Sequence, residues 1–302
     1  MKKLIYFLLI LPLLFAFGKN KKPKHSKFLT KYYVEVPAGK VVLSTKDYDI
    51  ILKNKKAGQE TELGIDSCET FYVSKGEVSN IHYKEFLSYL RQTGRMKEYT
   101  DNIPDTTVWR SKLSYNEPFM NYYYKHSAYN GYPVVGVTLK QANAYAEWLT
   151  EIYAMKDQEA KITFSVPTKK QWIRAARGET VNFYPWGGPN LRNSKGNYLA
   201  NFKNLDAGNI HFNREKKAYE LKISKTVADE MIITVPSQSY YPNSFGLYNM
   251  CGNVAELVSD ENIAMGGSWN DTGYDIRVES EQSAIEPSST VGFRVIATIE
   301  EK

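Results

Sequence analysis

The side chains that most often catalyse reactions or bind transition metals are few in this sequence and far apart. The two cysteines, Cys68 and Cys251, lie 183 positions from each other. The four histidines include no pair at i, i+4; they are His25, His82, His126 and His211. A structural zinc site needs four closely spaced thiolates or imidazoles, so the sequence does not predict one.

A serine nucleophile would be sought at Gly266–Gly267–Ser268. The chain has neither the Gly-x-Ser-x-Gly pattern of serine hydrolases nor a Gly-Lys-Thr/Ser phosphate loop. An activated serine also needs a histidine held by an aspartate, and no His–Asp pair is placed beside this segment in sequence. We therefore interpret the glycines as a turn with unusual backbone angles and do not predict a hydrolase.

Chemistry with hard cations is better supported by the second half of the chain. Ca²⁺ binds carboxylates, side-chain amides and backbone carbonyls, often on irregular loops. Such groups occur in short clusters at Asn201–Phe202, Asp229–Met231 and Asn253–Glu256. Asn and Asp also favour turns through local hydrogen bonds, so the clusters by themselves leave both interpretations open.

The start of the chain has the composition of an export signal. Lys2 and Lys3 precede an apolar stretch from Leu4 to Phe17, and residues 16–18 resemble a small-x-small cleavage site. The stretch is short for a membrane span of about 20 residues, although an uncleaved anchor is the alternative. We expect residues 1–18 to be a signal peptide and the mature protein to lie outside the cytoplasm. No cysteine follows the signal, so we expect no lipid anchor.

Eight lysines in the first 31 residues account for the net charge of +6. Without these eight, 31 basic residues remain against 33 acidic ones, so the rest of the chain has no basic footprint for nucleic acid. We expect residues 19–31 to be a linker whose run Lys19–Lys24 contacts anionic membrane surfaces or simply stays solvated.

In an exported protein Cys68 and Cys251 either pair or are small buried apolar residues.

One domain is expected from residue 32 to residue 298. Tyr33–Pro37 and Phe71–Val73 are predicted strands, and apolar residues at helical spacing predict a helix from Asn80 to a stop at Gly94. Two capping boxes, Thr138–Gln141 and Thr168–Gln171, predict the starts of two further helices. From about residue 178 onwards, Gly, Pro, Asn and Ser predict loops on a few short strands.

Nine segments, taken in order, resemble the formylglycine-generating-enzyme, or sulfatase-modifying-factor, family. The first, Phe71–Asn80, is similar to the family's F-x-I-x-K-Y-E-V-T-N opening. The others are Tyr132–Thr138, Ala142–Trp148, Ser165–Gly178, Tyr184–Gly187, Pro242–Met250, Gly252–Val254, Gly266–Trp269 and Gly292–Val295. The resemblance implies an irregular, loop-rich α+β fold related to C-type-lectin-like domains. It also implies bound Ca²⁺, at one site made by Asn201, Phe202, Asp229 and Met231 and a second with Asn253 and Glu256.

The resemblance fails where the family's chemistry takes place. Its enzymes carry two cysteines after Gly-Gly-Ser that bind copper and oxidise a substrate cysteine to formylglycine. These positions hold Asp271 and Ile276, and neither side chain replaces a thiolate on Cu(I). The family's iron-dependent branch needs three histidines that the chain lacks. We therefore expect no copper and no formylglycine formation, and a remodelled pocket that contains Asp271, Ile276, Glu279 and Arg294.

A middle segment resembles the insertion of gliding-motility and type IX secretion lipoproteins of the K and J types, which are Bacteroidetes envelope proteins. The similar stretches are Ile103–Trp109, Ser114–Pro118 and His126–Tyr129. The resemblance favours a non-catalytic scaffold in the periplasm or at the outer membrane, with envelope or secretion-machinery proteins as partners.

Two alternatives remain open from the sequence. One is an enzyme that uses Asp271, Glu279 or Arg294 in the remodelled pocket, against the simpler interpretation that Asp271 caps a turn and Arg294 forms a buried ion pair. The other is a Ca²⁺-dependent lectin-like binder of glycans or peptides, which exposed aromatic side chains around a Ca²⁺ site would indicate.

Overall fold

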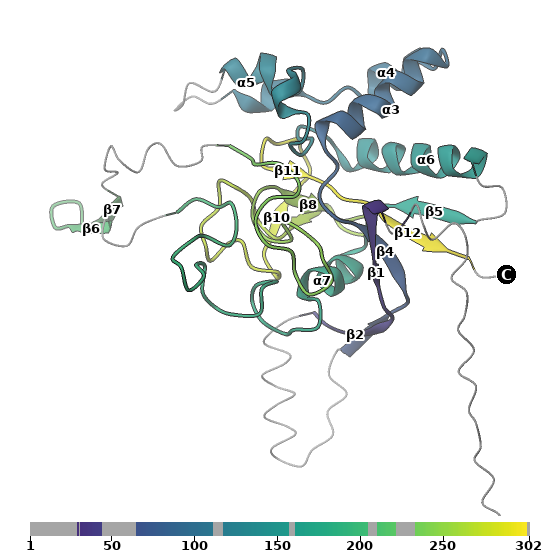
Figure 1. The fold of residues 1–302 in the computed structure, drawn as a ribbon. Helices are drawn as coiled ribbons and strands as arrows, with labels where there is room; N and C mark the ends of the chain where they lie inside the picture. Colours follow the sequence, from purple (N-terminus) through teal and green to yellow (C-terminus); the bar gives the residue numbers. More distant parts are fainter. Residues whose placement is uncertain are drawn as a thin grey trace, which may run out of the picture.

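A computed structural model describes residues 29, 31–43, 65–110, 117–156, 161–204, 210–221 and 233–300. The expected signal, residues 1–18, and nearly all of the expected linker lie outside these ranges. The described part has the predicted mixed α+β architecture with long irregular segments (Figure 1). No helix in the described ranges is long and apolar enough to span a membrane.

The central sheet joins distant parts of the chain in the order β1-β4-β12-β5, with all neighbours antiparallel. Its strands are β1 (Tyr33–Val36), β4 (Phe71–Ser74), β12 (Ile296–Ile299) and β5 (Ile162–Ser165). Successive residues of a strand face opposite sides, and Ile296 and Ala297 accordingly belong to different core clusters. The beginning and the end of the domain are therefore held together by one sheet.

Helices cover both faces of this sheet (Figure 1). On one side lie α3 (Asn80–Gln92) and α6 (Leu139–Lys156), which share a core cluster with β5, and on the other lies α7 (Lys169–Arg177). Both predicted capping boxes are confirmed: the amides of Gln141 and Gln171 donate to the Thr138 and Thr168 hydroxyls, and each glutamine side chain accepts from the threonine amide. These caps fix the start of α6 and α7.

After α7 the chain forms only short strands, as predicted. A second sheet has the order β10-β9-β8-β11, in which only β8 and β11 are parallel. Its strands are β8 (Ala255–Leu257), β9 (Ile263–Met265), β10 (Glu281–Ser283) and β11 (Val291–Gly292). Two separate pairs are β2 (Gly39–Val42) with β3 (Ile65–Cys68), and β6 (Ile210–Asn213) with β7 (Ala218–Leu221).

The middle segment forms a helical layer beside the sheets (Figure 1). It contains α4 (Met96–Asp101), η1 (Thr106–Trp109), α5 (Glu117–Tyr122) and η2 (Ser127–Tyr129). Trp109 packs on Tyr123, with ring centroids 4.5 Å apart, and stacks on Trp269 at 6.1 Å. The layer is thereby anchored on the segment that follows Gly266–Gly267.

The two cysteines are both free and buried, and both belong to the core cluster that contains α7. The structure therefore agrees with the second interpretation of the sequence, in which both cysteines are small buried apolar residues. Burial in this core raises the pKa of the Cys251 thiol well above its usual value.

Candidate functional site

The site is built on the turn that connects β9 to β10. Gly266 and Gly267 have φ angles of +85° and +65°, which side-chain-bearing residues rarely adopt. A Cβ on Gly267 would lie 2.5 Å from the Asp275 carbonyl oxygen. Glycine is therefore required twice here, and the turn brings residues 268–276 back over the end of the second sheet.

The side chain of Ser268 stabilises this turn. Its hydroxyl and its backbone N–H both donate to Oδ2 of Asp271, at 2.6 and 2.8 Å. The Ser268 residue is completely buried. This geometry matches the interpretation of Asp271 as a turn cap, and the buried hydroxyl is placed to hold the turn closed.

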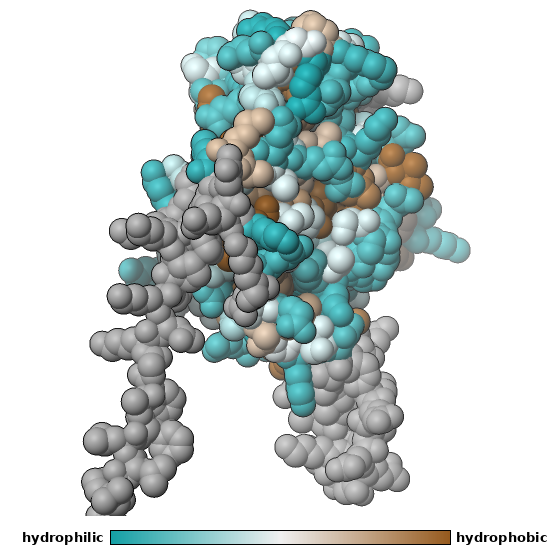
Figure 2. Space-filling model, turned by 90° about the vertical axis from the view of Figure 1, so that its right-hand side faces the viewer, coloured by the Kyte–Doolittle hydropathy of each residue, from teal (hydrophilic) through white to brown (hydrophobic). Residues whose placement is uncertain are grey.

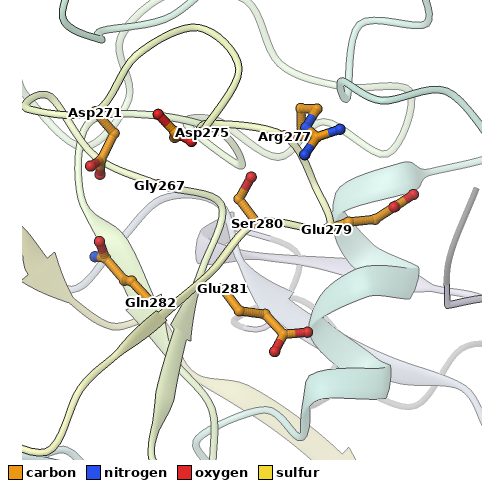
Figure 3. A pocket seen from close by; sticks show the side chains of 8 residues that line it. All are labelled: Gly267, Asp271, Asp275, Arg277, Glu279, Ser280, Glu281 and Gln282. Atoms are coloured by element: carbon orange, nitrogen blue, oxygen red, sulfur yellow. The ribbon is translucent and has the colours of Figure 1, made fainter.

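Beside the turn lies a cavity of about 380 Å³ (Figure 3). Four carboxylates and one guanidinium come from its wall, and the lining residues are Gly267, Asp271, Asp275, Arg277, Glu279, Ser280, Glu281 and Gln282. All belong to one stretch that leaves the glycine turn and returns through β10. Figure 3 shows Asp271, Asp275 and Arg277 on one side of the cavity, and Glu281 and Gln282 opposite.

Helix α7 supplies the counter-charges on one wall. Arg177 donates to Glu279 Oε1 at 2.6 Å, and Lys169 Nζ lies 2.9 Å from Glu281 Oε1. Burial alone would lower the pKa of Lys169, but hydrogen bonds to Glu281 and Glu261 raise it above its usual value. The wall is thus held by ion pairs between α7 and the return strand.

Two aromatic side chains pack against Arg277, which lines the cavity. The guanidinium of Arg277 lies 3.7 Å from the ring centroid of Tyr274 and 5.9 Å from that of Phe183, which are cation–π distances. Tyr274 is 68% exposed and Phe183 is 41% exposed. Exposed aromatic surface therefore lies next to Arg277, one of the residues that line the cavity.

Of the four residues predicted for the remodelled pocket, Asp271 and Glu279 line the cavity. Ile276 does not line the cavity; it is fully buried in a cluster with Tyr184, Ala200 and Phe202 and packs closely against Gly267. Arg294 does not line the cavity. Its side chain is 0% exposed and pairs with Glu256 in the core, because the Glu256 carboxylate and two backbone carbonyls accept its donors there.

Sequence reasoning missed the other cavity residues. Asp275, Arg277 and Glu281 carry no motif. No local pattern indicated that these charged side chains line one cavity.

The predicted Ca²⁺ ligands fall into two groups in the structure. Asn201 and Asn253 are in contact: the Asn201 amide donates to Asn253 Oδ1 at 3.3 Å and to the Ile233 carbonyl at 3.0 Å. The buried Asn201 Oδ1 accepts no hydrogen bond, which leaves an oxygen suited to a cation. Phe202 is buried beside it, and Asp229 and Met231 lie outside the described residues.

Glu256 has a different environment from the one that the second Ca²⁺ site requires. Both of its oxygens accept from Arg294, and Oε2 also accepts from Trp172 Nε1 at 2.6 Å. Asn253 is also engaged, with Val235 N on its Oδ1 and Glu77 Oε1 on its Nδ2. No group of three His, Cys, Asp or Glu residues at metal-binding distances occurs within the described ranges, and the residues at this second position fit an ion-pair network rather than a cation.

Glu77 is a further buried carboxylate in this network. Burial raises its pKa to about 8, with Glu256 adding to the rise and Arg294 opposing it. Its oxygens accept from the amides of Asn253 and Asn249. Two buried carboxylates therefore share one buried guanidinium.

Comparison with known proteins agrees with this architecture. A family model described as a sulfatase-modifying factor enzyme 1-like domain matches residues 19–299. The formylglycine-generating enzyme of Mus musculus is 25% identical over 256 residues, covering 77% of this chain and 58% of that protein. The Bos taurus enzyme is 26% identical over 251 residues, covering 75% and 57%. The chain therefore spans less than two thirds of the length of these relatives.

Solved structures show the same fold at low sequence identity. PvdO from Pseudomonas aeruginosa superimposes with a TM-score of 0.52 at 17% identity, covering 88% of this chain and 93% of PvdO. Treponema denticola variable protein 1 gives a TM-score of 0.52 at 15% identity, covering 87% and 94%. With a family model matching nearly the whole chain, the protein belongs to the sulfatase-modifying-factor, or formylglycine-generating-enzyme-like, domain family.

Proposed function

We propose that this chain is a non-catalytic binding protein of its family, which uses the cavity beside Gly267 to hold a ligand or a partner segment. The observation that carries the proposal is the chemistry at positions 271 and 276. The Asp271 carboxylate caps its own turn, and Ile276 is a buried methyl-bearing side chain. Neither provides the thiolate that copper chemistry requires.

The wall of the cavity supports a ligand with positive charge. Asp275 is exposed and its Oδ2 accepts from the Thr272 hydroxyl at 2.5 Å, while the exposed rings of Tyr274 and Phe183 lie against Arg277 of the same wall. Polar anchors with an aromatic rim are typical of binding surfaces. A basic or aromatic segment of a partner protein fits this combination.

The partner class follows from features outside the cavity. The expected export signal, the expectation that Lys19–Lys24 contacts anionic surfaces, and the resemblance of the middle segment to the K/J-type insertion support a scaffold in the periplasm or at the outer membrane, in secretion or gliding machinery. The insertion packs on Trp269, directly after the glycine turn. The face shown in Figure 2 is mainly hydrophilic with small hydrophobic groups, which favours the cavity over that face as the contact surface.

An enzyme with a remodelled site is the second candidate, because polar groups converge on the cavity. Against it, Asp271 and Glu279 already hold a turn and an ion pair. No cysteine or histidine is among the described lining residues, so a thiolate or imidazole base would have to come from the ligand.

Affinity purification of the tagged full chain from its native envelope, with partners identified by mass spectrometry, tests the proposal. We expect stoichiometric recovery of envelope proteins, loss of them with Asp275→Lys, and retention with Glu215→Lys, which changes the charge of an exposed turn elsewhere. In parallel, a cysteine peptide is incubated with the protein and copper. Conversion of the cysteine to formylglycine would refute the non-catalytic assignment.

We also propose one bound Ca²⁺, at Asn201 and the Phe202 carbonyl with Asp229 and Met231. The acceptor oxygen of Asn201 that lacks a partner supports this position. The ion pair of Glu256 with Arg294 is the reason that the proposal does not include a second Ca²⁺ at Asn253 and Glu256.

A further inference from the structure

Strand β10 forms an open edge of the second sheet. In the order β10-β9-β8-β11 its neighbour is β9, and no other strand of the described ranges pairs with it. Its two outer residues, Glu281 and Ser283, are both exposed. The open side of an edge strand carries backbone donors and acceptors to which a further strand can bond.

The ladder with β9 shows which backbone groups of β10 point outward. The Ser280 carbonyl accepts from the β9 side at 3.0 Å, and the Ala284 N–H donates to that side at 3.1 Å. Bonds to one neighbour recur at every second residue of an antiparallel strand, so the backbone of Gln282 also faces β9. The N–H and C=O groups of Glu281 and Ser283 therefore point to the open side, and neither residue has a backbone partner there among the described residues.

This edge lacks the features that usually protect an open strand, which are proline, lysine or a covering segment. Its outward residues are a glutamate and a serine, and Ile285, just after the strand, is 71% exposed. The β5 edge of the central sheet differs, because α6 covers it: the Phe164 N–H donates to the Thr150 hydroxyl at 2.9 Å. The β10 edge can therefore accept an extended segment and offers an apolar contact at one end.

The open edge borders the acidic cavity, because Glu281 lines it (Figure 3). The Glu281 side chain is 43% exposed, and its partner Lys169 is shared with a second carboxylate. Once the ion pairs with α7 are counted, Asp271 and Asp275 remain against Arg277 on the cavity wall. Opposite charges on neighbouring strands attract each other, so a cationic side chain on an added strand is favoured here.

We propose that β10 binds an extended peptide segment as an additional strand, with backbone hydrogen bonds to Glu281 and Ser283 and a lysine or arginine side chain beside Glu281. The inference rests on the proposed function and specifies how the cavity holds a partner segment. In strand addition the main-chain bonds provide affinity, while the side chains that enter neighbouring pockets provide selectivity.

The test is a calorimetric titration of the full chain with a short blocked peptide that alternates threonine and lysine, since threonine favours strands. We expect saturable binding in the millimolar range or tighter. A matched peptide with glutamate in place of lysine is expected not to bind. Methylation of alternate backbone nitrogens removes the N–H donors of one strand edge, so methylating one of the two alternating sets is expected to abolish binding and methylating the other is not.

Two variants of the protein isolate the backbone donor of Ser283. Ser283→Pro removes an N–H that the ladder with β9 does not use, and edge strands tolerate proline at such positions. It is expected to raise the dissociation constant of the lysine peptide at least tenfold, with a thermal unfolding curve as the check that the sheet remains folded. The inference uses only the backbone of Ser283, so the matched control Ser283→Ala is expected to bind as the wild type does.

Equal affinity of the wild type and Ser283→Pro, or absence of saturable binding, would overturn strand addition. A dimer of the chain that Ser283→Pro dissociates would also overturn it, because the edge would then belong to a second copy. In the affinity purification, partners lost with Asp275→Lys but retained with Ser283→Pro would support the proposed function and refute strand addition. Recovery of no partner by the wild type would refute the proposed function, and the peptide titration would then decide on strand addition alone.

Discussion

Replacing Glu77 with Gln tests the buried charge network most directly. The pKa of Glu77 is raised from 4.5 to about 8 by burial, then by the neighbouring Glu256. A carboxyl group with a higher pKa in the folded state than in the unfolded state binds its proton more tightly when folded. Its contribution to stability is therefore complete below pH 4.5 and is lost as the pH rises through about 8.

The magnitude follows from these two pKa values. Between them the unfolding free energy of the wild type falls by about 1.4 kcal/mol per pH unit on account of Glu77. Across the whole interval the loss is about 5 kcal/mol, which is comparable to the net stability of an average domain. Gln has no proton to lose, so Glu77→Gln removes this slope. At the acidic end the variant keeps an uncharged polar group beside Asn253, so its stability there stays close to that of the wild type.

The assay is urea unfolding followed by tryptophan fluorescence, from about pH 5 to about pH 8. Titrating groups that do not interact with Glu77 contribute equally to both proteins, so the difference between the two stability curves reports Glu77 together with its interaction with Glu256. Glu215→Gln, at an exposed turn, is the matched control and is expected to follow the wild type. Parallel curves for wild type and Glu77→Gln would refute the account of Glu77 as a protonated buried acid.

Three further predictions rest on single contacts. Arg294→Met leaves the buried Glu256 without its counter-ion and is expected to destabilise the protein by about 3–5 kcal/mol. Arg277→Met removes a cation–π contact with Tyr274 and is expected to cost about 0.5–1 kcal/mol. Chemical denaturation of both variants compares the two losses. Gly267→Ala is expected to cost at least about 1–3 kcal/mol in the same assay, because of the φ angle of +65° and the nearby Asp275 carbonyl. Added Ca²⁺ is expected to raise the midpoint of thermal unfolding; at a hundredfold excess over Kd the unfolding free energy rises by about 2.7 kcal/mol. Asn201→Ala is expected to abolish this effect. An unchanged response of the variant to Ca²⁺ would argue against Ca²⁺ at Asn201.

The sequence was most informative where local chemistry determines structure. The capping boxes at Thr138 and Thr168 predicted the first residues of α6 and α7, because the threonine and glutamine that satisfy the free amides lie within one turn. Strand β1 was predicted by its alternation, and the loop-rich second half by its composition. These signals depend only on neighbouring residues, so they can be interpreted without knowing how the chain folds.

Long-range placement was the part that sequence could not supply. The simpler interpretation of Arg294, a buried ion pair, is confirmed, and Arg294 does not line the cavity with Asp271. Its partner could not be identified from the sequence, because Glu256 lies 38 positions earlier and no local pattern records that pairing. Glu281 was missed for the same reason: its position in the cavity depends on Lys169 of α7 and on the register of β10 with β9. Ion pairs between distant elements emerge only from the packed fold.

The interactions that hold the frame involve few of the side chains that line the cavity. The glycine turn is fixed by backbone angles at Gly266 and Gly267, and the core beneath it by Glu256 and Arg294. Gly266 and Gly267 have no side chains, and Glu256 and Arg294 bond to each other in the core rather than to Asp271. Asp271 provides a turn cap and Ile276 a buried apolar contact, and neither is part of the ion pair that holds the frame. A fold whose frame and cavity depend on different side chains can vary the chemistry of the cavity and keep its shape.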